Sequence, residues 1–305
     1  MTADHLCIIP QKKRSIIAAL ENSKITETGT ISIPYASKNI RVQGSMFAAL
    51  YSGFNRGSKK LAVFDKSGRQ LSQKRPLKFE SIIGKGDAAY LGGEKLAFID
   101  LKDSALTVNE IELAEKFKSI GGMLVRNNDL FLIDNNAPST YVLKYNISEP
   151  SAPRHIGTNK LKNNGTNEHI IKGDISENWL VLFSSTADKS GTCQHISIVG
   201  KEENWINYSI LNFYAGKESL WRKWFGKGSR HDAFYKVCDI CVIRNKLLIL
   251  KENGLFLVDL SEKTDGQNIA QINNNENAYD RFLKINSENC IIHNEKKYEL
   301  MQFSV

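Results

Sequence analysis

The chain has 305 residues, a formal net charge of +8, and a composition that is 41% hydrophobic and 24% charged. These proportions are those of a globular protein and exclude wholesale disorder, and the length suits one large domain or two small ones. No stretch approaches 18 consecutive apolar residues, and the N-terminal apolar run is too short for a secretory signal. We therefore expect a cytoplasmic protein, with signal-independent secretion left open.

The first predicted element is a short helix over residues 11–22, in which Ile16, Ile17 and Leu20 would share one face. The basic residues that precede this face are Lys12, Lys13 and Arg14. Two interpretations stay open. The helix caps one end of the fold, or it is a basic arm for an acidic partner or a secretion signal.

A short pattern recurs along the rest of the chain: a polar turn, then an apolar strand that often ends in Asp. Its copies lie at residues 59–65, 94–100, 128–134, 178–184, 245–251 and 289–293. Turn signals follow several copies, and Gly68 and Gly254 supply the positive φ that tight hairpins require. The repeated unit is therefore an antiparallel hairpin.

An isolated hairpin cannot bury both of its faces, so the copies must pack against one another. Repeats of this length favour an all-β fold, a β-propeller of six blades that forms a single domain over residues 1–305. The count becomes seven if residues 1–45 form a blade of their own. A β-sandwich is the weaker alternative, because it would not repeat one hairpin six times. Residues 30–34 or 39–42 are candidates to pair with the last strand, 297–303, and close the ring.

One stretch resembles a known class of repeat. Residues 130–134 followed by 145–157 are similar to the LVIVD-type repeat of bacterial β-propellers, in which an aliphatic strand ending in Asp precedes a strand and turn containing two prolines. Residues 255–261 are similar to the same strand. Asn146 stands where the repeat usually has Asp. The resemblance implies a propeller in a bacterial setting and implies no activity.

Residues 212–236 interrupt the repeat, and residues 215–226 within them predict an amphipathic helix. Its apolar face would carry Leu220, Trp221, Trp224 and Phe225, flanked by Lys217, Arg222 and Lys223. Trp and Arg often dominate protein interfaces, and a basic aromatic helix can also lie on a membrane. Packing on its own propeller, contact with a partner protein and a membrane contact are the three interpretations, with the membrane the weakest.

The positive charge is concentrated in two segments. Residues 1–60 carry a net +6 and residues 215–236 a net +4, which leaves −2 for the remainder. The repeats themselves are therefore a poor polyanion-binding surface, and nucleic acid is a weak candidate partner. The candidate partner-binding residues are Lys12, Lys13, Arg14, Trp221, Arg222, Lys223, Trp224 and Phe225.

The sequence offers little evidence of catalysis. It contains no G-x-S-x-G elbow, no H-E-x-x-H and no phosphate-binding loop. Residues 186–193 nearly match the Asp-box of sialidases, but the match occurs once, and Asp-boxes are turn elements remote from catalysis. Cys238 and Cys241 form the one C-x-x-C. On a strand they would point to opposite faces, which favours structural thiols over a redox or metal role.

We therefore predict a non-catalytic β-propeller that binds another protein, with no cofactor, no metal and no catalytic residue to name. An immunity protein, an effector or a component of a bacterial assembly would fit this description. The alternative is a hydrolase or lyase with its site at the propeller mouth.

Overall fold

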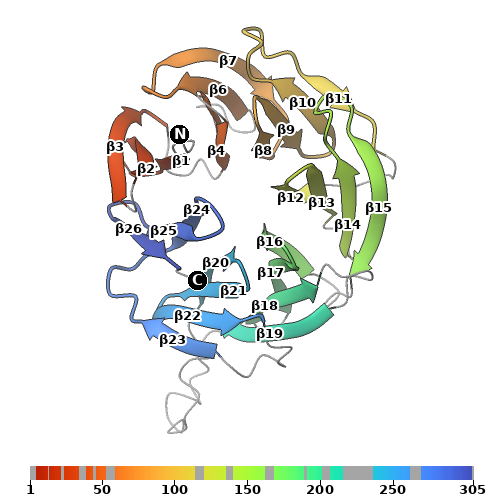
Figure 1. Ribbon diagram of the computed structural model, residues 1–305. Helices are drawn as coiled ribbons and strands as arrows, with labels where there is room; N and C mark the ends of the chain where they lie inside the picture. Colours follow the sequence, from red (N-terminus) through yellow and green to blue (C-terminus); the bar gives the residue numbers. More distant parts are fainter. Residues whose placement is uncertain are drawn as a thin grey trace, which may run out of the picture.

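The computed structural model describes residues 5–12, 14–21, 24–33, 39–43, 46–52, 59–113, 120–134, 140–161, 168–188, 191–200, 207–215, 236–261 and 269–303. These residues form seven small antiparallel sheets and contain no helix. Figure 1 shows the sheets arranged in chain order in a ring, with the first and last sheets next to each other. The all-β expectation is confirmed, and the described residues form seven sheets, the larger of the two blade counts that the sequence allows.

The first sheet contains β1 (His5–Ile9), β2 (Ser15–Glu21) and β3 (Lys24–Ile31). The second contains β4 (Asn39–Gln43), β5 (Met46–Ser52), β6 (Lys59–Asp65) and β7 (Gln70–Leu77). The third contains β8 (Ser81–Lys85), β9 (Ala88–Gly92), β10 (Leu96–Asp100) and β11 (Asn109–Ile111). The fourth contains β12 (Ile120–Arg126), β13 (Asp129–Asp134), β14 (Thr140–Asn146) and β15 (Arg154–Leu161).

The fifth sheet contains β16 (Glu168–Ile175), β17 (Trp179–Asp188), β18 (Gly191–Gly200) and β19 (Asn207–Ala215). The sixth contains β20 (Val237–Ile243), β21 (Lys246–Lys251), β22 (Gly254–Asp259) and β23 (Ile269–Asn273). The seventh contains β24 (Arg281–Lys284), β25 (Asn289–His293) and β26 (Tyr298–Gln302). The first strand of each sheet lies nearest the centre of the ring, and from β1 to β24 each first strand contacts the next (Figure 1).

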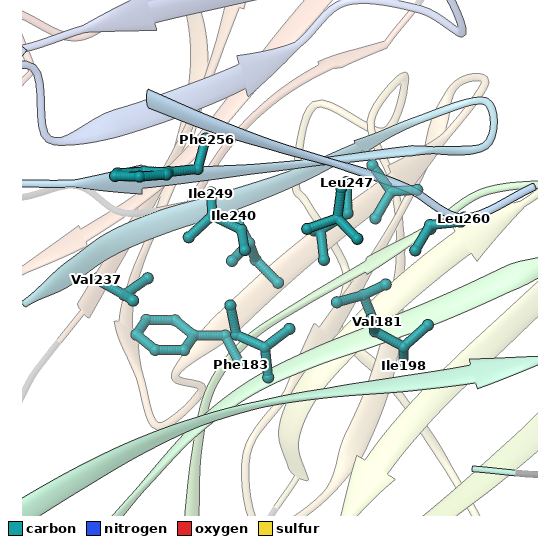
Figure 2. Close-up of a cluster of buried hydrophobic side chains, with 12 residues drawn as sticks. Val181, Phe183, Ile198, Val237, Ile240, Leu247, Ile249, Phe256 and Leu260 are labelled. Carbon is teal, nitrogen blue, oxygen red and sulfur yellow. The ribbon is translucent and has the colours of Figure 1, made fainter. Parts of the chain in front are cut away.

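The core lies between neighbouring sheets, and this explains the apolar runs in the sequence. In β17 the side chains of Val181 and Phe183 pack against the sixth sheet, whereas Leu180 and Leu182 pack against the fourth. Figure 2 shows Val181 and Phe183 facing residues of the sixth sheet that include Leu247. A strand that is buried on both faces needs apolar residues at every position rather than at alternate ones.

The predicted helix over residues 11–22 is wrong. Residues 15–21 form β2, the central strand of the first sheet. Ile17 packs toward the second sheet, while Ile16 and Ala18 pack toward the seventh. The hydrophobic periodicity of a short apolar run that is buried on both faces does not distinguish a strand from a helix. Its β-branched residues and its tertiary packing therefore determine that it forms a strand.

The predicted strand exchange at the ring closure is also wrong. Thr30 and Ile31 belong to β3 and pair with β2, and residues 39–43 form the innermost strand of the second sheet. No strand pairing joins the first and last sheets in the described residues. They meet instead through apolar side chains, among them Cys7 and Ile291.

Asp259 and Asn146, which end β22 and β14, have the same local function. Asp259 Oδ1 accepts hydrogen bonds from the Ser261 backbone N–H at 2.9 Å and from the Ser261 hydroxyl. Asn146 Oδ1 accepts the same two bonds from Ser148, at 3.0 and 2.6 Å. The carboxylate of Asp259 and the amide oxygen of Asn146 therefore close the same kind of turn.

Candidate functional site

Two of the predicted partner-binding residues lie in the turn between β1 and β2. Lys12 and Arg14 are exposed there, and neither forms an ion pair within the described residues. Lys13 and residues 221–225 lie outside the described residues. Of the predicted insertion, residues 212–215 belong to β19, and residues 216–235 are likewise outside.

The ring closure brings two lysines from the last sheet next to Lys12 and Arg14. The backbone N–H of Lys12 donates to the carbonyl of Glu295 at 3.1 Å. Lys296 and Lys297, next in the chain, are exposed in the turn between β25 and β26. We call Lys12, Arg14, Lys296 and Lys297 the seam cluster. Glu295 is the exposed acidic residue within the two turns.

Sequence reasoning missed Lys296 and Lys297 because they are 282 or more positions away from Arg14. A signal was present, since this doublet lies at the start of the last predicted strand, residues 297–303. If the first and last segments of a ring meet, the charges that flank them meet as well.

A separate group of charges lies on three neighbouring innermost strands. Lys172 of β16 places its Nζ 2.7 Å from Asp239 Oδ1 of β20. Asp239 also accepts the backbone N–H of Ile240 at 2.8 Å and that of Phe282, on β24, at 2.7 Å. The ammonium and the carboxylate therefore link the fifth, sixth and seventh sheets.

Asp174 of β16 repeats this arrangement one step along the strand. Its carboxylate accepts the backbone N–H of Ile175 at 2.7 Å and that of Val242, on β20, at 2.6 Å. Lys284 of β24 donates to Asp174 Oδ1 at 3.2 Å and to the Ile175 carbonyl at 2.8 Å. We call Lys172, Asp174, Asp239 and Lys284 the axial network.

The axial network is arranged for structure rather than for acid–base chemistry. An innermost strand has one edge without a partner strand, so its N–H groups there need other acceptors. Asp174 and Asp239 supply these acceptors. Burial alone would lower the pKa of Lys172, but the charge and hydrogen bond of Asp239, together with the charges of Cys241 and Asp174, outweigh burial and raise the pKa. Lys172 is thus a fixed cation rather than a proton donor near neutral pH.

His293 is a buried titratable residue on β25, with 2% of its surface exposed. Burial lowers its pKa to about 4, with further lowering by Arg281 and Lys172 and partial compensation by a hydrogen bond to the Asn294 backbone. Its Nδ1 has no hydrogen-bond partner among the described residues. The ring is therefore neutral near pH 7.

The near Asp-box coincides with the hairpin between β17 and β18. Thr186 and Cys193 are opposite each other in this ladder. His195 Nε2 lies 2.8 Å from the Thr186 hydroxyl, and its Nδ1 lies 4.0 Å from Cys193 Sγ. The described residues of the stretch, 186–188 and 191–193, belong to the paired strands β17 and β18.

The C-x-x-C lies on β20, but its geometry differs from the expectation. Cys238 and Cys241 pack against the same apolar cluster between the sixth and seventh sheets, because a bulge between Val237 and Asp239 shifts the register. Both thiols are free. A hydrogen bond to Cys290, together with burial, raises the pKa of Cys241, and burial raises that of Cys238 to about 11. Neither is an activated thiolate.

No group of three or more His, Cys, Asp or Glu side chains suited to a metal ion occurs within the described residues. In the same part of the chain we find no helix that could cross a bilayer.

Comparison with solved structures identifies the fold. Hydrazine synthase of Kuenenia stuttgartiensis matches with a TM-score of 0.63 at 9% identity, over 99% of this chain and 96% of that one. The Pan2 WD40 domain of Neurospora crassa matches with a TM-score of 0.57 at 11% identity, over 98% and 90%. The tricorn protease matches with a TM-score of 0.52 at 10% identity, over 98% of this chain and 32% of that one.

The chain is therefore a β-propeller. No protein-family model matches the chain, and neither does any curated protein. At these identities the structural matches establish the fold alone.

Proposed function

We propose that this β-propeller is a non-catalytic module that binds another protein, and that the seam cluster is part of its binding surface. The observation that carries the proposal is that four exposed cations from the two ends of the chain lie in two turns joined by the bond from the Lys12 N–H to the Glu295 carbonyl. Apolar residues of the first and last sheets pack beneath these turns, among them Ile16 and Ile291. A fixed cationic surface of this kind favours a partner with complementary acidic residues.

The second part of the proposed surface is Trp221, Arg222, Lys223, Trp224 and Phe225. It rests on the sequence alone, because these residue types are frequent at interface hot spots. The LVIVD-type resemblance of residues 130–134 and 145–157 is the reason for proposing a bacterial immunity protein, effector or assembly component. The hydrolase or lyase alternative has less support, because Asp174 and Asp239 are already engaged by backbone N–H groups and lysines.

The test compares charge reversals by affinity capture from the native cell and mass spectrometry. Lys12→Glu with Arg14→Glu should deplete a specific acidic protein from the captured set, and Arg222→Glu with Lys223→Glu should do the same if the insertion contributes. The matched control reverses two exposed lysines of the second sheet region, Lys66→Glu with Lys78→Glu. Identical captured sets for all three variants and the parent protein would overturn the proposal.

The tryptophan pair needs its own control. Trp221→Ala with Trp224→Ala should weaken partner capture while the thermal unfolding midpoint stays within a few degrees of the parent protein. If the double variant unfolds instead, residues 221–225 are core and do not belong to the binding surface.

A further inference from the structure

The seventh sheet has one strand fewer than most of the others. Five sheets contain four strands, whereas the first and seventh contain three within the described residues. β26 is therefore the third strand of its sheet. In five other sheets a fourth strand pairs with the outer edge of the third strand; these fourth strands are β7, β11, β15, β19 and β23. Figure 1 shows β26 at the border between the seventh and first sheets.

The outer edge of β26, which pairs with no other strand of the described residues, presents regularly spaced backbone groups. Asn294 N–H donates to the Lys297 carbonyl at 3.0 Å at one end of the ladder with β25, and Phe303 N–H donates to the Glu288 carbonyl at 2.9 Å at the other. Bonded and non-bonded pairs alternate in an antiparallel ladder. The N–H and C=O groups of Tyr298, Leu300 and Gln302 therefore point away from β25, toward the open edge.

β26 differs from the other outermost strands in regularity. The ladders that hold β3, β7, β15, β19 and β23 each contain a register shift. β11 is three residues long. The ladder of β26 runs over five residues without a shift, and β26 contains neither Lys nor Pro. Bulges, very short strands, prolines and charged side chains, lysine above all, help to prevent an edge from accepting another strand. Of these, β26 has only one charged residue, Glu299.

The charges near β26 are unequal at its two ends. Lys296 and Lys297 directly precede Tyr298, and the Lys12 to Glu295 hydrogen bond adds Lys12 and Arg14 to the same end. At the other end, Glu288 is paired with Arg244. Among the described residues, the Tyr298 end is therefore cationic, with four cations against Glu27 and Glu295, and Glu288 at the Gln302 end is compensated by Arg244.

From these observations we infer that an extended segment of a partner protein adds to β26 as the fourth strand of the seventh sheet. The segment runs antiparallel to β26, as fourth strands do in the other sheets, and its acidic residues follow the paired stretch, toward its C-terminal end, where they meet the seam cluster. This inference rests on the proposed function and specifies the kind of partner segment. Backbone hydrogen bonds hold the segment along the edge of β26, and the attraction between its acidic residues and the seam cluster sets the direction in which it runs.

The probe is a labelled peptide, Thr-Val-Thr-Val-Thr-Glu-Glu-Glu, titrated against the full chain by fluorescence anisotropy. Its control has the same composition with the acidic residues first, Glu-Glu-Glu-Thr-Val-Thr-Val-Thr. We expect the first peptide to bind about tenfold more tightly, because only its acidic end reaches the cations when the strands are antiparallel. Hydrogen exchange should slow over residues 298–302 with the first peptide.

Two variants separate the charge from the edge. Lys296→Glu with Lys297→Glu should lower affinity about tenfold, whereas the control Lys66→Glu with Lys78→Glu should leave it unchanged. Gln302→Pro removes an outward N–H without removing a bond to β25, so it should weaken peptide binding. Its thermal unfolding is measured alongside to confirm that the propeller is intact.

Equal binding of the two peptides, no slowing of exchange at residues 298–302, or no peptide binding at millimolar concentration would overturn the inference. So would protection of residues 298–302 by phosphatidylserine vesicles or by a single-stranded oligonucleotide in place of the peptide. The two proposals can fail separately. If the peptide does not bind but the variant Lys12→Glu with Arg14→Glu still captures one native protein fewer than the parent protein, strand addition is wrong and the proposed function stands. If the captured partners are also unchanged, both are wrong.

Discussion

The hydroxyl of Tyr298 donates a hydrogen bond to Glu27 Oε1 at 2.8 Å, joining the third strand of the last sheet to the third strand of the first across 271 positions of sequence. Because no strand pairing closes the ring in the described residues, the closure depends on this bond, on the bond from the Lys12 N–H to the Glu295 carbonyl, and on the apolar cluster between the two sheets. Tyr298→Phe should therefore destabilise the fold by about 1 kcal/mol, measured by urea unfolding. Glu27→Gln, which keeps an acceptor, should cost less. Equal stability of Tyr298→Phe and the parent protein would show that the bond between Tyr298 and Glu27 adds nothing to the closure of the ring.

The same contact predicts a response to alkaline pH. Burial, followed by the hydrogen bond to Glu27 and its charge, raises the pKa of Tyr298 to about 12. The folded state thus holds this proton more tightly than the unfolded chain. Its contribution to stability is complete below the ordinary tyrosine pKa near 10 and is lost as the pH rises toward 12. Tyr298→Phe should therefore lose less unfolding free energy than the parent protein between pH 10 and pH 12, as measured by urea unfolding at each pH.

The axial network predicts an asymmetry between its two charges. Asp239→Ala leaves two backbone N–H groups and the Lys172 ammonium without their acceptor, so it should cost about 3–5 kcal/mol. Lys172→Met leaves the Asp239 carboxylate with both backbone bonds and should cost clearly less. Denaturant unfolding of the two variants measures the difference. A larger loss of unfolding free energy for Lys172→Met would mean that Asp239 stabilises the fold mainly through its ion pair with Lys172 and not through its bonds to backbone N–H groups.

His293 predicts a loss of stability in acid. Its folded pKa, lowered to about 4, is below the ordinary value of 6.5, so the unfolded chain takes up a proton before the folded one does. The contribution of His293 is complete above pH 6.5 and is lost as the pH falls toward 4, by up to about 3 kcal/mol. His293→Gln should flatten the decline in unfolding free energy between pH 7 and pH 4.5. Parallel curves for the two proteins would place the acid sensitivity elsewhere.

Two glycines with positive φ provide a matched pair. Gly68 has φ +88°, and a Cβ there would lie 2.5 Å from the Thr30 carbonyl oxygen of the neighbouring sheet. Gly86 has φ +57° with nothing within 4 Å of a Cβ. Gly86→Ala should cost about 1 kcal/mol for the left-handed backbone alone. Gly68→Ala should cost about 2–3 kcal/mol more, because backbone must also move. Thermal unfolding of the two variants measures these costs. Equal losses of stability for Gly68→Ala and Gly86→Ala would show that the first two sheets can move apart easily.

The sequence contained the repeat unit because hairpin formation is local. Apolar runs such as Leu130–Asp134, turn glycines such as Gly68, and the Asp or Asn that closes the next turn all act within a few residues, so a single copy can be recognised. The ring architecture followed, since such hairpins must pack against one another. The sequence also placed Lys12 and Arg14 on the surface.

The tertiary structure alone decided what happens where the ends meet. The run Ser15–Glu21 resembles a helix locally and is a strand because the second and seventh sheets bury both of its faces. Lys296 and Lys297 join Lys12 because the ring closes, and Asp239 finds Lys172 because adjacent sheets align their innermost strands. Chain periodicity encodes contacts within a blade, whereas contacts between blades depend on how many blades there are and how the ring is completed.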